Sequence, residues 1–131
     1  MLMLAAALLI AAPAVAQNVA PDDVANGFFQ KLKSGQTAKA YRDLWQGTLM
    51  DRKQAEVDFV ISQTDLIMKA YGPMADWELM KDDVLSPSFR IRTYLVRFDA
   101  GALFFKLQFY RAPRGWMVLN LDFRDRYAAL P

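Results

Sequence analysis

Carboxylates, tyrosines and arginines are the side chains with which this 131-residue chain could do chemistry, because it contains neither cysteine nor histidine. This composition excludes thiol nucleophiles, imidazole bases, triads of the Ser-His-Asp type and the usual zinc sites. A carboxylate held in an apolar pocket could still act as a general base. Asp43 and Asp65 are the candidates, although a position on a solvated helix surface is the simpler interpretation of both. We predict no metal site and no cofactor.

The arginines are concentrated towards the C-terminal end of the chain. Residues 17–83 hold eight basic and eleven acidic residues, whereas residues 84–126 hold eight basic and three acidic ones, seven of the eight being arginine. Arginine favours bidentate contacts with carboxylate or phosphate. The pattern indicates either an anionic ligand or partner, or a solvated sheet whose charged edges resist aggregation. The formal net charge of +2 gives no argument for binding nucleic acid.

The N-terminal segment, residues 1–16, consists of apolar residues and one proline. It is too short to span a bilayer, which needs about 20 residues. It ends in Ala14-Val15-Ala16, a small-x-small pattern, and we predict a signal peptide that is cleaved between Ala16 and Gln17. A buried N-terminal helix and an uncleaved anchor are the alternatives. The prediction implies a periplasmic or secreted protein of one domain, residues 17–131, with no stable membrane anchor after cleavage.

The mature chain divides near Gly72-Pro73, because the apolar spacing is helical before this point and close to two after it. We expect helices from Pro21 to about Ser34, from Thr37 to Trp45, and from the Thr48–Asp51 region to Tyr71. Four strands should follow, the last three as an antiparallel meander joined by tight turns. The expected strands are 76–81, 88–98, 102–110 and 116–124. Helices followed by strands predict an α+β fold with the helices packed on one face of the sheet.

This order of elements resembles the NTF2-like superfamily, also called the cystatin-like α+β cone. The resemblance covers residues 20–126, and its clearest segments are Tyr71-Gly72-Pro73 and the stretch from Phe109 to Trp116 (FYRAPRGW). It implies three N-terminal helices packed on a curved antiparallel sheet of about four strands. The superfamily includes isomerases, dehydratases, hydrolases and non-catalytic binders, so the resemblance implies a shape more than an activity.

The resemblance also bears on catalysis, because steroid-isomerase members use a tyrosine of the first helix together with two acids. This chain has Phe28 and Phe29 in that helix and no tyrosine there. Dehydratase-like members rely on histidine, which is absent. Both departures argue against catalysis.

Alternation along the last two strands predicts which side chains enter the cone. Leu103, Phe105, Leu107 and Phe109 share one face of the third strand, and we expect them to be buried with the 117/119/121/123 set of the fourth. The cone is then either filled by its own side chains or open as an apolar ligand cavity. Tyr41 and Trp45 would floor the mouth of such a cavity, or else belong to the core.

The opposite face of the sheet carries an aromatic patch in this prediction, formed by Phe104, Tyr110, Trp116 and Val118. Exposed apolar patches often mark an interface, and members of the superfamily frequently dimerise through the outer sheet face. We therefore predict a homodimer, with scattered surface aromatics as the alternative.

Arg97 breaks the alternation of its strand. Counting from Phe89, Ile91 and Leu95 places Arg97 on the apolar face, unless a β-bulge near residues 93–95 reverses the parity. We expect the bulge; without it, Arg97 is an inward cation and the best candidate for contacting a ligand.

Three functions follow from these observations. The first is an exported, non-catalytic module that binds a small apolar or anionic ligand or a protein partner. The second is a cofactor-free isomerase, dehydratase or hydrolase with Asp43 or Asp65 as the base. The third is a structural homodimer that acts through the outer sheet face.

Overall fold

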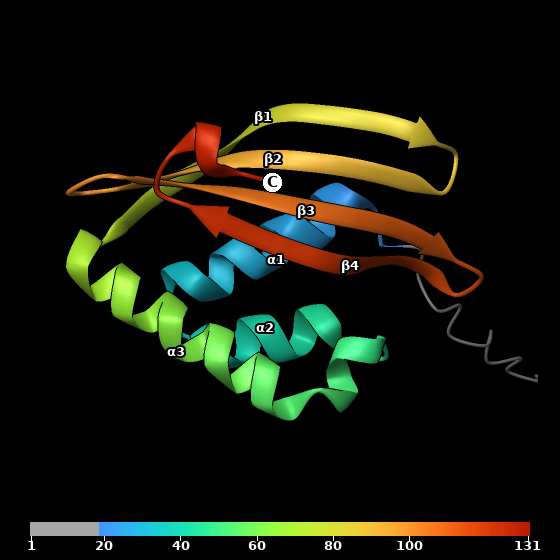
Figure 1. The fold of residues 1–131 in the computed structure, drawn as a ribbon, viewed down its shortest axis with the longest axis horizontal. Helices are drawn as coiled ribbons and strands as arrows, with labels where there is room; N and C mark the ends of the chain where they lie inside the picture. Colours follow the sequence, from blue (N-terminus) through green and yellow to red (C-terminus); the bar gives the residue numbers. More distant parts are fainter. Residues whose placement is uncertain (1–18) are drawn as a thin grey trace, which may run out of the picture.

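The computed structural model describes residues 19–131, and the predicted signal peptide lies outside these residues. Figure 1 shows two layers, with the helices on one face of a four-stranded sheet. The helical layer contains α1 (Pro21–Lys33), α2 (Thr37–Trp45), the short 3-10 helix η1 (Leu49–Arg52) and α3 (Gln54–Tyr71). The strands are β1 (Met74–Ser86), β2 (Phe89–Phe98), β3 (Ala102–Ala112) and β4 (Gly115–Arg124), and a final turn, η2 (Tyr127–Ala129), follows. The predicted α+β fold is confirmed.

The helix ends follow local sequence. Pro21 occupies the first turn of α1, with Asp22 and Asp23 beside it, where a missing N–H is tolerated and acids favour the positive end of the helix dipole. Gly72 ends α3 with a φ of 79°, a left-handed conformation that glycine adopts without a steric penalty. The start of α1 and the end of α3 therefore lie close to where the sequence predicts, whereas α3 begins at Gln54, after the separate η1, and not at residues 48–51.

The sheet is an antiparallel meander of all four strands, in the order β1-β2-β3-β4. The first strand was predicted too short, because it continues through Ser86 and pairs with β2 along its whole length. Three register shifts interrupt this pairing, between Met74 and Asp76, Leu79 and Lys81, and Val84 and Ser86. Such bulges bend a strand and increase its twist.

The predicted facing of β2 is right for Val96, Arg97 and Phe98 but wrong for the first half of the strand, and the expected bulge is absent. Its pairing with β3 has no register shift, so no bulge lies near residues 93–95 of β2. Arg92, Tyr94, Val96 and Phe98 are the buried set and point towards the helices. Because β2 is regular, its first half faces opposite to the prediction and Arg92 lies inside, whereas Arg97 lies outside, where the expected bulge would also have placed it.

A single bulge also reverses part of β4. Gln108 pairs with Asn120 and Phe109 with Val118, so Leu119 is the extra residue between them. Val118 consequently enters the core with no exposed surface, whereas Leu119 is 45% exposed. The sequence prediction assumed unbroken alternation and exchanged these two residues.

The interior between sheet and helices is filled by aromatic rings. Phe105 of β3 lies 5.4 Å from Phe29, 6.2 Å from Phe28 and 5.1 Å from Phe123 between ring centroids. Leu103, Leu107 and Phe109 are buried with it, as predicted. Fully burying one such side chain stabilises a fold by about 1.5–3 kcal/mol. The filled interior agrees with the packed alternative for the cone.

The C-terminal segment folds back over the outer face of the sheet (Figure 1). Tyr127 of η2 packs edge-on against Phe104, with 5.8 Å between the ring centroids. The Lys106 ammonium group donates a hydrogen bond to the carbonyl oxygen of Pro131. Thr93, an outer-face residue of β2, is buried beneath this cover.

Candidate functional site

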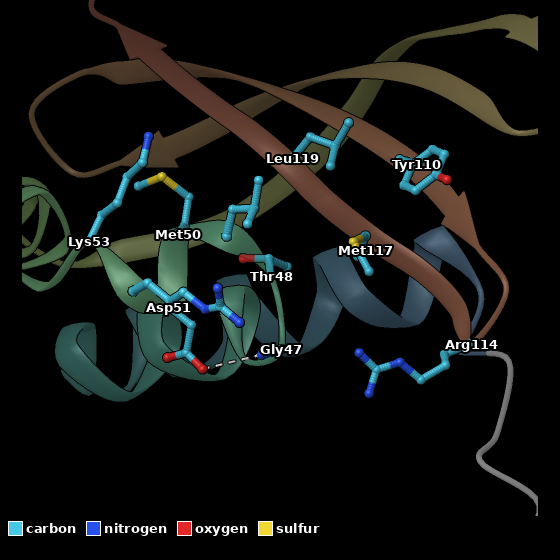
Figure 2. Close-up of a pocket in the computed structure, with 11 residues that line it drawn as sticks. Gly47, Thr48, Met50, Asp51, Lys53, Tyr110, Arg114, Met117 and Leu119 are labelled. Carbon is cyan, nitrogen blue, oxygen red and sulfur yellow. Dashed lines mark hydrogen bonds between the residues drawn. The ribbon is translucent and has the colours of Figure 1, made fainter.

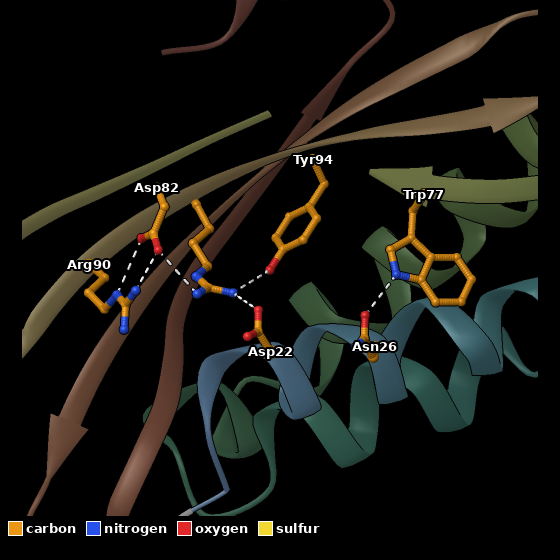
Figure 3. Close-up of polar contacts among 7 residues, drawn as sticks. Asp22, Asn26, Trp77, Asp82, Arg90 and Tyr94 are labelled. Carbon is orange, nitrogen blue, oxygen red and sulfur yellow. Dashed lines mark hydrogen bonds and ion pairs between the residues drawn. The ribbon is translucent and has the colours of Figure 1, made fainter. Parts of the chain in front are cut away.

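Arg92 is the cation that faces the helices, and its side chain is only 6% exposed. Its guanidinium group pairs with Asp22 of α1 and lies 3.1 Å from Oδ2 of Asp82 in β1. It also donates to the Tyr94 hydroxyl at 3.2 Å, and Arg90 forms a two-pronged pair with Asp82. Figure 3 shows this group converging between the sheet and the start of α1. We call these five residues the Arg92 cluster.

The electrostatics of the Arg92 cluster favour its charged forms. The hydrogen bond from Arg90, together with the positive charges of both arginines, outweighs burial and lowers the pKa of Asp82. Burial by itself lowers the pKa of Arg92, but its hydrogen bonds to Asp22 and Tyr94 reverse this effect and raise it. Burial raises the pKa of Tyr94. Arg92 and Asp82 therefore stay ionised, and Tyr94 stays neutral, near neutral pH.

A second polar contact, beside the Arg92 cluster, also connects α1 with β1. The indole Nε1 of Trp77 donates to Oδ1 of Asn26 at 2.9 Å, and its ring stacks on Phe29 (Figure 3). Both contacts attach α1 to the sheet. The Arg92 cluster thus attaches α1 to the sheet. Its charges are already paired, so it is not an open site for a ligand.

Asp43 and Asp65, the predicted catalytic candidates, line none of the three hollows described below. Asp43 is on the surface, where Lys31 and Lys39 approach its carboxylate at 3.1 and 3.0 Å. Hydrogen bonds from these two lysines lower the pKa of Asp43, which is the opposite of what a general base near neutral pH requires. Asp65 is half-buried on α3 and follows directly after Thr64, which belongs to the core.

Tyr41 and Trp45 are core residues. Tyr41 has no exposed surface, and its hydroxyl lies 2.8 Å from Oγ1 of Thr64. Because Thr64 donates its own proton to the Val60 carbonyl oxygen, Tyr41 is the donor in this pair. Burial raises the pKa of Tyr41. Trp45 is 4% exposed, and its Nε1 has no hydrogen-bond partner among the described residues.

The residues predicted to contact a ligand or a partner are dispersed. Arg97 is half-exposed on the outer face and pairs with Asp76 at 3.0 Å, so it is not an inward cation. Of the predicted interface set, Val118 lies in the core and Trp116 packs against the core, both because of the bulge at Leu119. Phe104 is covered by Tyr127. Tyr110 remains exposed, and the homodimer stays a prediction.

A concave surface lies between η1 and the β3–β4 hairpin, and we call it the η1 groove. It has a volume of about 650 Å³. The strands contribute Met117, Leu119 and Tyr110. The loop at Gly47 and Thr48, together with η1, lines the other side (Figure 2). The complete lining is Gly47, Thr48, Leu49, Met50, Asp51, Arg52, Lys53, Tyr110, Arg114, Met117 and Leu119.

The charges of the η1 groove differ from those of the Arg92 cluster. Arg52, Lys53 and Arg114 line it, all three are exposed, and none has an ion-pair partner within residues 19–131. The lining contains one acid, Asp51, whose carboxylate accepts a hydrogen bond from the Gly47 amide at 3.3 Å (Figure 2). Cations next to the methionine and leucine side chains suit a ligand with an anionic head and an apolar body.

Sequence reasoning missed both Arg92 and the η1 groove. A signal for Arg92 existed, since Tyr94, Val96 and Phe98 alternate with it, but the opposite phase was equally apolar. Nothing in the sequence indicates that the segment 47–53 approaches Arg114, because more than fifty residues separate them. The concentration of arginine in residues 84–126 was the available hint.

Comparison with solved structures identifies the architecture. A crystal structure of a Campylobacter jejuni protein, provisionally named an NTF2-like transpeptidase, superposes with a TM-score of 0.57. The two chains are 21% identical, and the match covers 75% of this chain and 95% of the other. The fold is NTF2-like. No protein-family model matches the chain, and no curated protein matches it either.

Two further features are absent from the described residues. None of the helices within residues 19–131 is long and apolar enough to cross a membrane. The same residues contain no group of three or more carboxylates that could hold a metal ion.

Proposed function

We propose that this NTF2-like protein is an exported, non-catalytic binding module whose η1 groove holds a ligand with an anionic head and an apolar body. One observation carries the proposal: three cations without ion-pair partners in residues 19–131 stand beside an apolar surface of Met50, Met117 and Leu119. Elsewhere in the described chain, buried and half-buried arginines are paired, as Arg92 and Arg90 are with Asp82. The unpaired cations can therefore attract an anion without breaking an existing contact.

The ligand binds through charge at one end and burial at the other. The exposed cations contribute modestly, about 0.2–1 kcal/mol each, because water screens them. Burial of apolar surface contributes about 25 cal/mol per Å² and supplies most of the affinity. The module therefore favours amphipathic anions over small, fully polar ones such as free phosphate.

Dodecanoate binding, followed by titration calorimetry, tests the proposed function. We expect saturable binding that exceeds that of uncharged dodecanol and weakens with added salt. Arg52→Gln and Arg114→Gln should each reduce the affinity about threefold to fivefold. Arg97→Gln is the matched control, because Arg97 is also exposed but pairs with Asp76 outside the groove. Equal affinity for dodecanoate and dodecanol would contradict the proposal.

Export rests on the small-x-small pattern at Ala14-Val15-Ala16. Expression of the full chain in a bacterium, followed by mass spectrometry of the periplasmic fraction, tests it. We expect a mature protein that begins at Gln17, four residues before α1 begins at Pro21. Recovery of the uncleaved chain in the membrane fraction would contradict the proposal and favour an anchor.

A further inference from the structure

We infer that the η1 groove is one end of a longer binding surface along β4, and that its occupant is an extended peptide with an acidic C-terminal end, added to the sheet as a fifth strand. This inference rests on the proposed function, because it names the class of ligand for the same groove.

The surface continues from the η1 groove along the whole of β4. A second hollow of about 430 Å³ adjoins the first through Met50 and is lined by Phe59 of α3 and by Leu121. A third, of about 400 Å³, follows between Leu66 of α3 and Phe123. Together the three hollows follow β4 in order from Met117 to Arg124. We call this surface the β4 trough.

The wall of the β4 trough opposite the strand is unusually apolar for a surface. Leu49 of η1 is 74% exposed, and Phe59 and Leu66 of α3 are 64% and 71% exposed. All three line the trough. Large apolar side chains that gather along one groove mark a binding surface more often than isolated ones do.

The strand itself decides between a peptide and a hydrocarbon chain. β4 is the last strand of the sheet, so one edge of its backbone has no neighbouring strand within the described residues. A hydrocarbon chain that extended beyond the η1 groove along this edge would remove water from the free N–H and C=O groups and leave them without partners. Each such loss costs about tenfold or more in affinity. A peptide in the extended conformation supplies those partners instead.

Charge sets the direction of the peptide. The cations Arg52, Lys53 and Arg114 stand where β4 begins, whereas Arg124 and Asp125, of opposite charge, stand where it ends. Every pairing in the sheet is antiparallel. A fifth strand that continues this pattern ends its own chain at the start of β4, and its C-terminal residues then lie beside the three cations. Acidic residues belong at that end.

The probe is a fluorescent peptide of about seven residues, long enough for one strand, with valine and threonine alternating and two glutamates at the C-terminal end. Fluorescence anisotropy with the full chain measures its affinity. We expect binding that falls several-fold when the glutamates are moved to the N-terminal end. Two N-methylated peptides should differ, one methylated at its odd-numbered amides and one at its even-numbered amides (the two methylation phases). Methylation of the set that faces β4 should weaken binding about tenfold or more, and methylation of the other set should weaken it little.

Substitutions locate the site. Phe59→Ser should weaken peptide binding, because Phe59 lines the β4 trough, and Arg114→Gln should weaken it at the charged end. Leu85→Ser is the matched control, since Leu85 is 63% exposed on the other edge strand, β1, away from the trough. Circular dichroism verifies that each variant is folded.

The outcomes separate this inference from the proposed function. Phase-dependent N-methylation together with a loss in Phe59→Ser supports a fifth strand. If dodecanoate binds and Arg114→Gln weakens it, while the peptide does not bind or both methylation phases act equally, the strand-addition inference is overturned and the proposed function stands. If neither probe binds, both are overturned.

Discussion

Arg92 and Arg114 both belong to the sheet, yet their surroundings are opposite. Arg92 is buried against α1 and is held by Asp22, Asp82 and Tyr94. Arg114 is exposed at the β3–β4 turn beside an apolar groove, without an ion-pair partner in residues 19–131. Desolvation explains the difference, because a buried charge is tolerated only when it is paired, whereas an exposed one is stabilised by water. The paired cation attaches α1 to the sheet, and the unpaired cations are those that we propose bind an anionic ligand.

Removing the buried cation should have the largest effect on stability. Arg92→Met keeps much of the side-chain volume but leaves Asp82 with Arg90 alone and releases Asp22 from the sheet. We expect a loss of about 3 kcal/mol in the free energy of unfolding, measured with urea. Arg97→Met removes an exposed pair and should cost at most about 1 kcal/mol. Equal losses of unfolding free energy in the two variants would show that the Arg92 cluster does not stabilise the attachment of α1 to the sheet.

An intermediate effect, dependent on pH, should come from Asp82. Its pKa is lowered in the folded protein, so it binds a proton less readily there than in the unfolded chain. Its stabilising contribution is therefore complete above the unfolded pKa of about 4 and is lost as the pH falls through the lower, folded value. Urea unfolding between about pH 6 and about pH 2 should show a shallower acid loss in Asp82→Asn than in the unmodified protein.

Asp43→Asn is the control for this pH series. Lys39 and Lys31 lower the pKa of Asp43 as well, but the pairs lie on the surface. Salt should therefore weaken the Asp43 contribution more than that of Asp82. Identical responses to salt would contradict the distinction between the partly buried Asp82 and the surface carboxylate.

A smaller effect should separate two tyrosines. Tyr41→Phe removes a buried hydrogen bond to Thr64 and should cost about 1 kcal/mol in the free energy of unfolding. Tyr110→Phe, at the edge of the η1 groove, should leave the stability nearly unchanged. Thermal unfolding of both variants checks this difference, and a larger loss in Tyr110→Phe would place a structural role at the groove.

The smallest effect on stability should come from the cations of the η1 groove. The double substitution of Arg52→Gln and Arg114→Gln breaks no ion pair within the described chain, and we expect the free energy of unfolding to change by at most about 0.5 kcal/mol. The same protein should lose dodecanoate affinity. A large loss of stability would instead assign these residues to the fold.

Local sequence was sufficient to predict most of the helices and strands. The helix spacing and the glycine and proline residues predicted α2 at its observed bounds, Thr37–Trp45, and α3 ending at Tyr71. The inward facing of Phe105 and Leu107 followed from alternation along β3, which left open whether the cone is filled or hollow. These features depend on residues near one another in the chain, where backbone geometry fixes which side chains share a face.

The order of helices and strands, the antiparallel meander and the apolar face of β3 were thus determined by the sequence itself. Which face of β2 is inside was decided only by tertiary structure, because both phases of that strand are apolar enough to be buried and pairing with β3 selects one. The bulge at Leu119 likewise arises from register with β3, and it moves Val118 into the core. The η1 groove requires Arg52 and Arg114, which are far apart in the chain, to line the same hollow. Distant contacts of this kind depend on packing, and no local pattern encodes them.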